Sequence, residues 1–206
     1  MGLVLGGLIA VAVTGCNGGD DGDLPDFSGT AGGGASAGAS ATTPAPDPVA
    51  AVGKTLPAKG TELGDDKNPV TVGKTVKGNE QVQIAYLAFW VERARALRAV
   101  QVDDAALAKV AVGDAASRVV TSVRQLQEEK LHTEGGLTVN VVALKLDGAT
   151  ATVTDCLLDR STNRKANGDA VEAPRFAPVP LTATMEQKGE GWRVRKIADA
   201  KASACT

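Results

Sequence analysis

Aromatic residues and histidine are scarce in this chain of 206 residues. Phe, Trp and Tyr together make up 3% of the sequence, and His132 is the only histidine. A zinc site needs several nitrogen or sulfur ligands, so a chain with one histidine and three cysteines is predicted to hold no metal. The formal net charge is −2, and no segment is basic enough to predict a nucleic-acid-binding surface.

Motifs that bind phosphate-bearing cofactors or activate a nucleophile are also missing. The glycine run at residues 32–34 neither follows a predicted strand nor precedes a predicted helix, so it is not a phosphate-binding loop. No serine stands in the strand-to-turn-to-helix setting of a hydrolase nucleophile. The sequence therefore predicts no cofactor and excludes serine hydrolases.

No apolar run is long enough to cross a bilayer, which takes about 20 residues. The run at residues 3–13 has the length of a signal-peptide core and ends in Val13-Thr14-Gly15-Cys16. This ending resembles the bacterial lipoprotein signal, the lipobox, in which Leu, a small residue, and Gly or Ala precede Cys. Val13 replaces the usual Leu, and no Lys or Arg precedes the run, which indicates a start codon upstream of Met1.

The resemblance implies an envelope protein held on the membrane by lipid. Residues 1–15 would be a signal peptide, and Cys16 would carry the diacylglycerol and further acyl chains such as palmitate. Two or three acyl chains anchor a protein durably, since each buried CH₂ contributes about 0.8 kcal/mol. The expected location is the outer face of the bacterial cytoplasmic membrane. The alternative is a buried apolar strand that ends at a chance Gly-Cys pair.

Residues 16–78 are predicted to be a flexible linker. This stretch is rich in Gly, Ala, Ser, Thr, Pro and Asp, and it has too little apolar surface to offset the entropy of ordering. As a coil it would span roughly 45 Å, enough to hold a domain clear of the lipid. Val70 and Val72 show weak strand alternation, which leaves open a short strand at this point.

The folded domain is predicted to cover residues 79–206 and to open with a long helix over residues 79–100. Apolar side chains recur there at three- and four-residue steps on two adjoining stripes, which indicates a helix covered on more than one side. Two more helices are expected over residues 105–112 and 114–131, with His132 at the end of the last.

After Gly135 and Gly136 the pattern changes to the period of strands. Four strands are expected, at residues 138–146 and 149–158 and around residues 181–185 and 192–197. The alternation slips by one residue between Val141 and Val142, which predicts a β-bulge, and Asp147-Gly148 predicts a hairpin turn. Residues 161–173 are interpreted as a polar loop.

This order of elements resembles the cystatin-like cup of the nuclear transport factor 2-like superfamily, including lipoproteins of actinobacteria. The resemblance is carried by an aromatic pair in the first helix, an Asp-Cys at a strand end, a Trp-x-Val strand and a late cysteine: Tyr86 and Phe89-Trp90, Asp155-Cys156, Trp192-Arg193-Val194, and Cys205. It implies an α+β fold in which N-terminal helices pack into a curved, four-stranded antiparallel sheet.

Five residues are candidates for lining a pocket in that cup: Tyr86, Trp90, Arg93, Asp155 and Trp192. Asp155 is expected on the apolar face of its strand, where burial would raise its pKa, as suits a general base. Some enzymes of the cup fold are similar in using a pocket Asp with a Tyr, here Tyr86, to move protons beside a carbonyl. Alternatively, Asp155 caps nearby backbone or pairs with an arginine.

Arg93 interrupts the apolar stripe of the first helix. It could bind an anionic ligand inside the cup, or it could pair with a carboxylate such as Asp155.

Two functions of different classes follow from these residues. The first is a non-enzymatic binding module, in which the cup holds a small apolar ligand or the surface binds an envelope protein. The alternative is a small isomerase or dehydratase that uses Asp155 and Tyr86. An enzyme needs Asp155 to point into an open pocket of a few hundred Å³, and a filled cup would leave only surface interactions.

Assigning Cys16 to lipid leaves Cys156 and Cys205. Oxidation is permitted outside the cytoplasmic membrane, and a tail that folds back over the sheet would bring the two residues together. The sequence therefore predicts a disulfide between them. The alternative is two unpaired thiols.

Overall fold

The computed structural model describes residues 47–174 and 176–205. The predicted signal peptide, Cys16 and the first part of the predicted linker lie outside the described residues. None of the described helices is long and apolar enough to cross a membrane.

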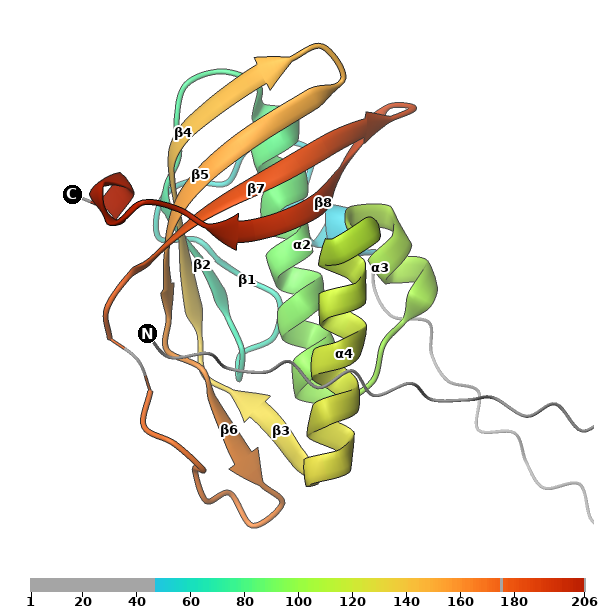
Figure 1. Cartoon of the computed structure of the whole chain (residues 1–206), viewed down its shortest axis with the longest axis vertical. Helices are drawn as coiled ribbons and strands as arrows, with labels where there is room; N and C mark the ends of the chain where they lie inside the picture. The colour runs from blue at the N-terminus through green and yellow to red at the C-terminus, as the bar shows by residue number, and fades with distance from the viewer. Residues whose placement is uncertain (1–46, 175, 206) are drawn as a thin grey trace, which may run out of the picture. The chain divides into compact units, whose positions relative to one another are not determined.

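Four α-helices and one short 3₁₀ helix occupy the described residues (Figure 1). Their bounds are α1 Pro48–Val52, α2 Glu80–Ala99, α3 Asp104–Val110, α4 Gly113–Glu129 and η1 Ala202–Cys205. Side chains cap three of the starts: Asp47 accepts a hydrogen bond from the Val49 N–H at 3.0 Å, Asn79 one from Val82 at 3.1 Å, and Asp103 one from Ala106 at 2.9 Å. These caps satisfy amide donors that the first helical turn leaves unpaired.

Eight strands form two sheets. The bounds are β1 Glu62–Leu63, β2 Val70–Lys74, β3 Leu131–Glu134, β4 Leu137–Asp147, β5 Thr150–Asp159, β6 Thr162–Lys165, β7 Val179–Lys188 and β8 Gly191–Asp199. The larger sheet is six-stranded, in the order β1-β2-β4-β5-β7-β8, and the smaller one pairs β3 with β6. β2 runs parallel to β4, while the other neighbours in the larger sheet are antiparallel.

The prediction of a four-stranded antiparallel sheet is therefore wrong. The fold is α+β, but its main sheet is mixed and has six strands, and a second sheet lies beside it. The four predicted strands correspond to β4, β5, β7 and β8. The added parallel pairing comes from β2, which precedes the long helix in sequence and lies next to β4 in space.

Residues 47–78 belong to the folded domain, so the predicted boundary at Asn79 is too late. This segment contributes α1, β1 and β2. Val70 and Val72 are fully buried, and the buried Asn68 side chain donates hydrogen bonds to the carbonyls of Ala94 and Thr133 at 3.3 and 3.0 Å. The segment resembles a linker because its strands are short and its order depends on partners far along the chain.

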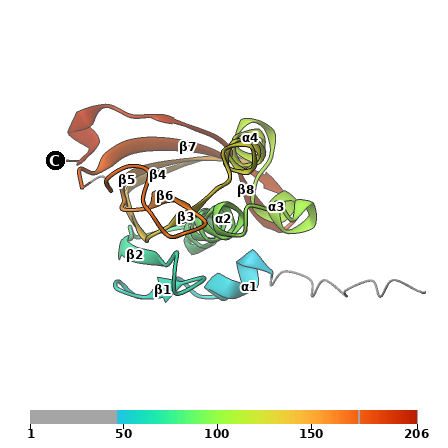
Figure 2. The same cartoon turned by 90° about the horizontal axis from the view of Figure 1, so that it is seen from below.

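The long helix α2 is enclosed on several sides, as its two apolar stripes predict. It contacts α1, α3, α4 and the strands β2, β3 and β8. Figure 2 shows α4 and β7 above it, α3 at its right, and α1, β1 and β2 below it. Tyr86, Phe89 and Trp90 are buried there, and Trp192 of β8 is buried as well. This arrangement supplies most of the core, because a helix apolar on more than one face must be covered on each.

The main sheet bends at the predicted bulge. The register of β4 against β5 shifts between Val141 and Ala143, which confirms the phase slip read from the alternation. A second shift, between Thr184 and Met185, lies in the pairing of β7 with β8. These irregularities let the sheet curve so that β8 packs on α2, α3 and α4.

The segment interpreted as a polar loop contains a strand. β6 pairs antiparallel with β3, so that Leu131 lies opposite Lys165 and Glu134 opposite Thr162. His132 lies within β3, because α4 ends at Glu129 and Lys130 takes a left-handed conformation. The placement of His132 at a helix end was wrong for this reason.

Candidate functional site

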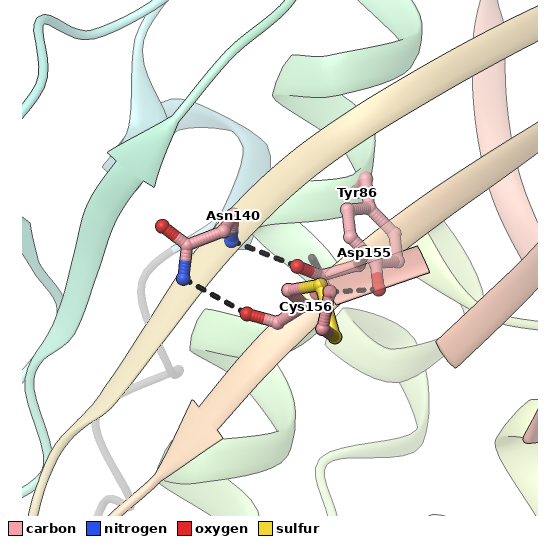
Figure 3. The surroundings of a disulfide bond; sticks show 5 residues. Tyr86, Asn140, Asp155 and Cys156 are labelled. Atoms are coloured by element: carbon pink, nitrogen blue, oxygen red, sulfur yellow. Dashed lines mark hydrogen bonds between the residues drawn. A yellow bond between two sulfur atoms is a disulfide. The ribbon is translucent and has the colours of Figure 1, made fainter. Parts of the chain in front are cut away.

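Asp155 and Tyr86 meet in the core. Asp155 is fully buried, and one of its oxygens accepts the Tyr86 hydroxyl at 3.0 Å while the other accepts the Asn140 N–H at 2.7 Å (Figure 3). Asn140 comes from β4 and lies directly before the register shift of that strand. Burial raises the pKa of Asp155 to about 6, and the hydrogen bonds from Asn140 and Tyr86 oppose that rise.

This pair has no path to a substrate in the described structure. Tyr86 is completely buried, and its pKa lies well above its usual value, first because of burial and then because of the nearby Asp155 charge. Neither residue borders either of the two hollows described below. The arrangement matches the alternative reading of Asp155, in which it accepts hydrogen bonds from its neighbours, with Asn140 as the backbone donor.

The disulfide lies next to this pair. Cys156 follows Asp155 on β5 and is bonded to Cys205 of η1, with a Cα–Cα distance of 5.4 Å. The Asn140 side-chain amide donates to the Cys156 carbonyl at 2.8 Å, so Asn140 connects β4 to both residues (Figure 3). η1 contacts β5 and β7, and the bond holds the C-terminal tail over these strands.

A hollow of about 770 Å³ lies between α4, α2 and the strands β5 to β8. Its floor includes Phe89, Trp90 and Arg93 of α2, and its walls include Ser122 of α4 and Asp159 at the end of β5. Apolar side chains cover much of the remainder: Ala115, Val119, Leu157, Val179, Leu181 and Ile197. Of the five predicted pocket residues, Trp90 and Arg93 border this hollow, whereas Tyr86, Asp155 and Trp192 do not.

Arg93 is the charged residue on the floor. Its guanidinium lies over the Trp90 ring, 5.4 Å from the ring centroid. Burial lowers the pKa of Arg93, and the charge of Asp159 opposes that shift. The predicted pairing of Arg93 with Asp155 is absent, because Asp155 is bonded to Tyr86 and Asn140.

A smaller hollow of about 160 Å³ adjoins the first. Both are bordered by Arg93, Ser122, Ser161 and Asn163, so Arg93 lies where they meet. The three polar neighbours were not predicted as site residues. Ser161 and Asn163 fell in the segment interpreted as a loop, and the one usable signal was the cluster of small polar residues directly after the Asp155 strand.

Metal ligation finds no support in the described part of the chain. No group of three or more His, Cys, Asp or Glu residues there could hold an ion. Glu134 instead forms ion pairs with Arg98 and Arg164, and its carboxylate lies 3.4 Å from His132 Nε2. The contact with Arg98 is the main cause of its lowered pKa. This cluster ties the small sheet to α2.

Comparisons with known proteins identify no family. No family model matches the chain, and no curated protein does. Among solved structures, the intermembrane space region of the chloroplast protein ARC6 matches with a TM-score of 0.41 and 13% identity, covering 59% of this chain and 89% of that one. A de novo designed β-sheet protein matches with a TM-score of 0.24 and 20% identity, over 58% of this chain and 82% of the design. Similarities this weak carry no argument about function.

Proposed function

We propose that this chain is a lipid-anchored binding protein of the bacterial cell envelope, whose domain takes up a small, largely apolar ligand in the hollow beside α4. The observation that carries the proposal is the hollow itself. Its volume of about 770 Å³ falls within the range of about 300–1,000 Å³ that is usual for small-molecule sites. It combines apolar walls with a few polar side chains, as such sites do.

The anchor is supported by the sequence around Cys16 and by the state of the other cysteines. Val13-Thr14-Gly15-Cys16 resembles a lipobox. Cys156 and Cys205 are joined, as is usual for proteins outside the reducing cytoplasm. A thioether at Cys16 would then account for all three cysteines of the chain. The isomerase alternative lacks such support, because Asp155 and Tyr86 border neither hollow.

Replacing the proposed lipidated residue, Cys16→Ser, is expected to abolish acylation. Metabolic labelling with a clickable fatty acid in the producing bacterium should mark the wild type, and the wild type should fractionate with membranes. The variant should carry no label and should accumulate unprocessed or leave the membrane fraction. Cys205→Ser serves as the matched control, since it also removes one sulfur and should keep the label. Equal labelling of Cys16→Ser and the wild type would contradict the anchor.

Binding in the hollow can be tested by placing a bulky side chain on α4. Ser122 is half-buried and borders both hollows, so Ser122→Trp should fill the space that the ligand needs. Arg124 is exposed on the same helix and borders neither hollow, which makes Arg124→Trp a control of equal bulk.

A further inference from the structure

We propose that the ligand is a single-chain anionic amphiphile, such as a long-chain carboxylic acid, and that Arg93 binds its acid group at the junction of the two hollows. This inference rests on the proposed function and names the ligand class for the same site. It follows from the state of Arg93, from the neighbours of its guanidinium, and from the distribution of apolar surface along the hollow.

Arg93 lacks the partner that its neighbours on α2 have. Arg95 forms an ion pair with Glu92 at 2.6 Å, and Arg98 forms one with Glu134. Among the described residues, Arg93 has no hydrogen bond or ion pair, although its side chain is only partly exposed. A partly desolvated guanidinium without an acceptor is costly, and an anion that supplies two oxygens would remove the cost.

The polar residues around Arg93 favour an anion with a single charge. Ser122 and Asn163 are neutral and can donate hydrogen bonds to an oxygen, whereas the Ser161 hydroxyl already donates to Asp159. Asn163 uses its side-chain oxygen to accept from Thr133 at 3.0 Å, which leaves its amide hydrogens as donors. These groups resemble the donor set that a carboxylate needs.

Asp159 limits how much negative charge the site can accept. It is close enough to Arg93 to oppose the fall in the arginine's pKa. One of its oxygens is already engaged, because it accepts both the backbone N–H and the hydroxyl of Ser161, at 2.9 and 2.5 Å. A monoanion at Arg93 meets one repelling carboxylate, whereas a phosphate dianion would meet twice that repulsion.

Apolar surface extends away from Arg93 in the larger hollow. Phe89, Leu181 and Ile197 border that hollow, together with the half-buried Val179. The other charged groups of its lining, Asp114, Arg118 and Glu172, are exposed and therefore solvated at the rim. An acid group at Arg93 would thus place a hydrocarbon chain on apolar walls, with the rim charges outside.

Trp90 provides a direct optical readout. The chain has two tryptophans, and only Trp90 borders the hollow, so a Trp192→Phe background makes the fluorescence report on this site. Dodecanoate, dodecanol and dodecyltrimethylammonium are titrated below their micelle concentrations into the domain with its disulfide intact. We expect dodecanoate to bind about 10- to 100-fold more tightly than dodecanol, as a charge-assisted hydrogen bond predicts.

Arg93→Gln should lower dodecanoate affinity to that of dodecanol and leave dodecanol affinity unchanged, while Arg93→Lys should keep part of the preference. Arg124→Gln is the matched control, because it removes an exposed arginine of α4 that borders neither hollow and should change neither affinity more than about twofold. Thermal unfolding of each variant verifies that it is folded.

Each remaining outcome decides against the inference. Arg93 does not bind the acid group if dodecanol binds as tightly as dodecanoate, or if dodecyltrimethylammonium binds more tightly than dodecanoate. The same conclusion follows if Arg93→Gln keeps the preference for dodecanoate. In each of these cases, binding in the hollow still stands. If none of the three probes changes Trp90 fluorescence, the inference and the ligand-binding part of the proposed function are both overturned.

Discussion

Removing the disulfide is expected to lower the free energy of unfolding by roughly 4 kcal/mol, in the double variant Cys156→Ala, Cys205→Ala. The bond closes a loop between residues 49 apart in sequence, and the chain-entropy model assigns about 4 kcal/mol to a loop of this length. A small domain has only about 5–15 kcal/mol in total, so the variant should be close to unfolding at physiological temperature.

Removing the disulfide should also loosen the C-terminal tail of the folded protein. The bond holds η1 against β5 and β7, and the tail beyond β8 would fray without it. Chemical denaturation of the oxidised wild type and the double variant gives the difference directly. Wild type treated with reductant is the control, because it should unfold near the double variant's midpoint. Equal midpoints for all three samples would show that the bond contributes little.

Asp155 is expected to make the free energy of unfolding depend on pH, with a total change of about 3 kcal/mol. Its folded-state pKa of about 6 lies above the usual value of 3.8, because burial disfavours the charge. The folded protein therefore holds this proton more tightly than the unfolded chain does. The contribution of Asp155 to stability should be fully present below about pH 4, fall as the pH rises to about 6, and level off above that.

Asp155→Asn should remove this dependence. The amide can still accept from the Asn140 N–H, and it can donate to the Tyr86 hydroxyl, so both contacts survive without a buried charge. We expect the variant to be more stable than the wild type by up to about 3 kcal/mol at pH 7.5 and similar to it near pH 4. Denaturant titrations across this range provide the measurement.

Tyr86→Phe is the companion variant, since it removes a hydrogen bond that lowers the pKa of Asp155. Its loss of stability should be larger at pH 7.5 than at pH 4. The wild-type stability could instead be flat or rise between pH 4 and 6, with Asp155→Asn following the same curve. That result would mean that the pKa of Asp155 is not raised in the folded protein.

The elements most visible in the sequence are those whose pattern is local. α2 is marked by its apolar stripes and by Asn79, and the bulge at Val141 by a slip in alternation. β2 was left as linker because its burial depends on a parallel pairing with β4, more than sixty residues away. β6 carries no apolar alternation, because it pairs with β3 at the domain's edge.

The candidate site was only partly predictable for a similar reason. Arg93 drew attention because it interrupts an apolar stripe, and Trp90 lies one turn before it. Ser122 comes from α4, Asn163 from β6 and Ser161 from the connection before β6, so only tertiary packing brings them to Arg93. The proximity of Tyr86 and Asp155 was foreseen, whereas their complete enclosure depends on packing that no single segment encodes.

The most direct test of the proposed function is native mass spectrometry of the protein released from bacterial membranes in a mild detergent. We expect the wild type to carry a non-covalent small-molecule adduct in addition to the covalent lipid on Cys16. Arg124→Trp should keep that adduct, and Ser122→Trp should lose it while retaining the covalent lipid. A wild type without an adduct, or an adduct that persists unchanged in Ser122→Trp, would contradict binding in the hollow beside α4.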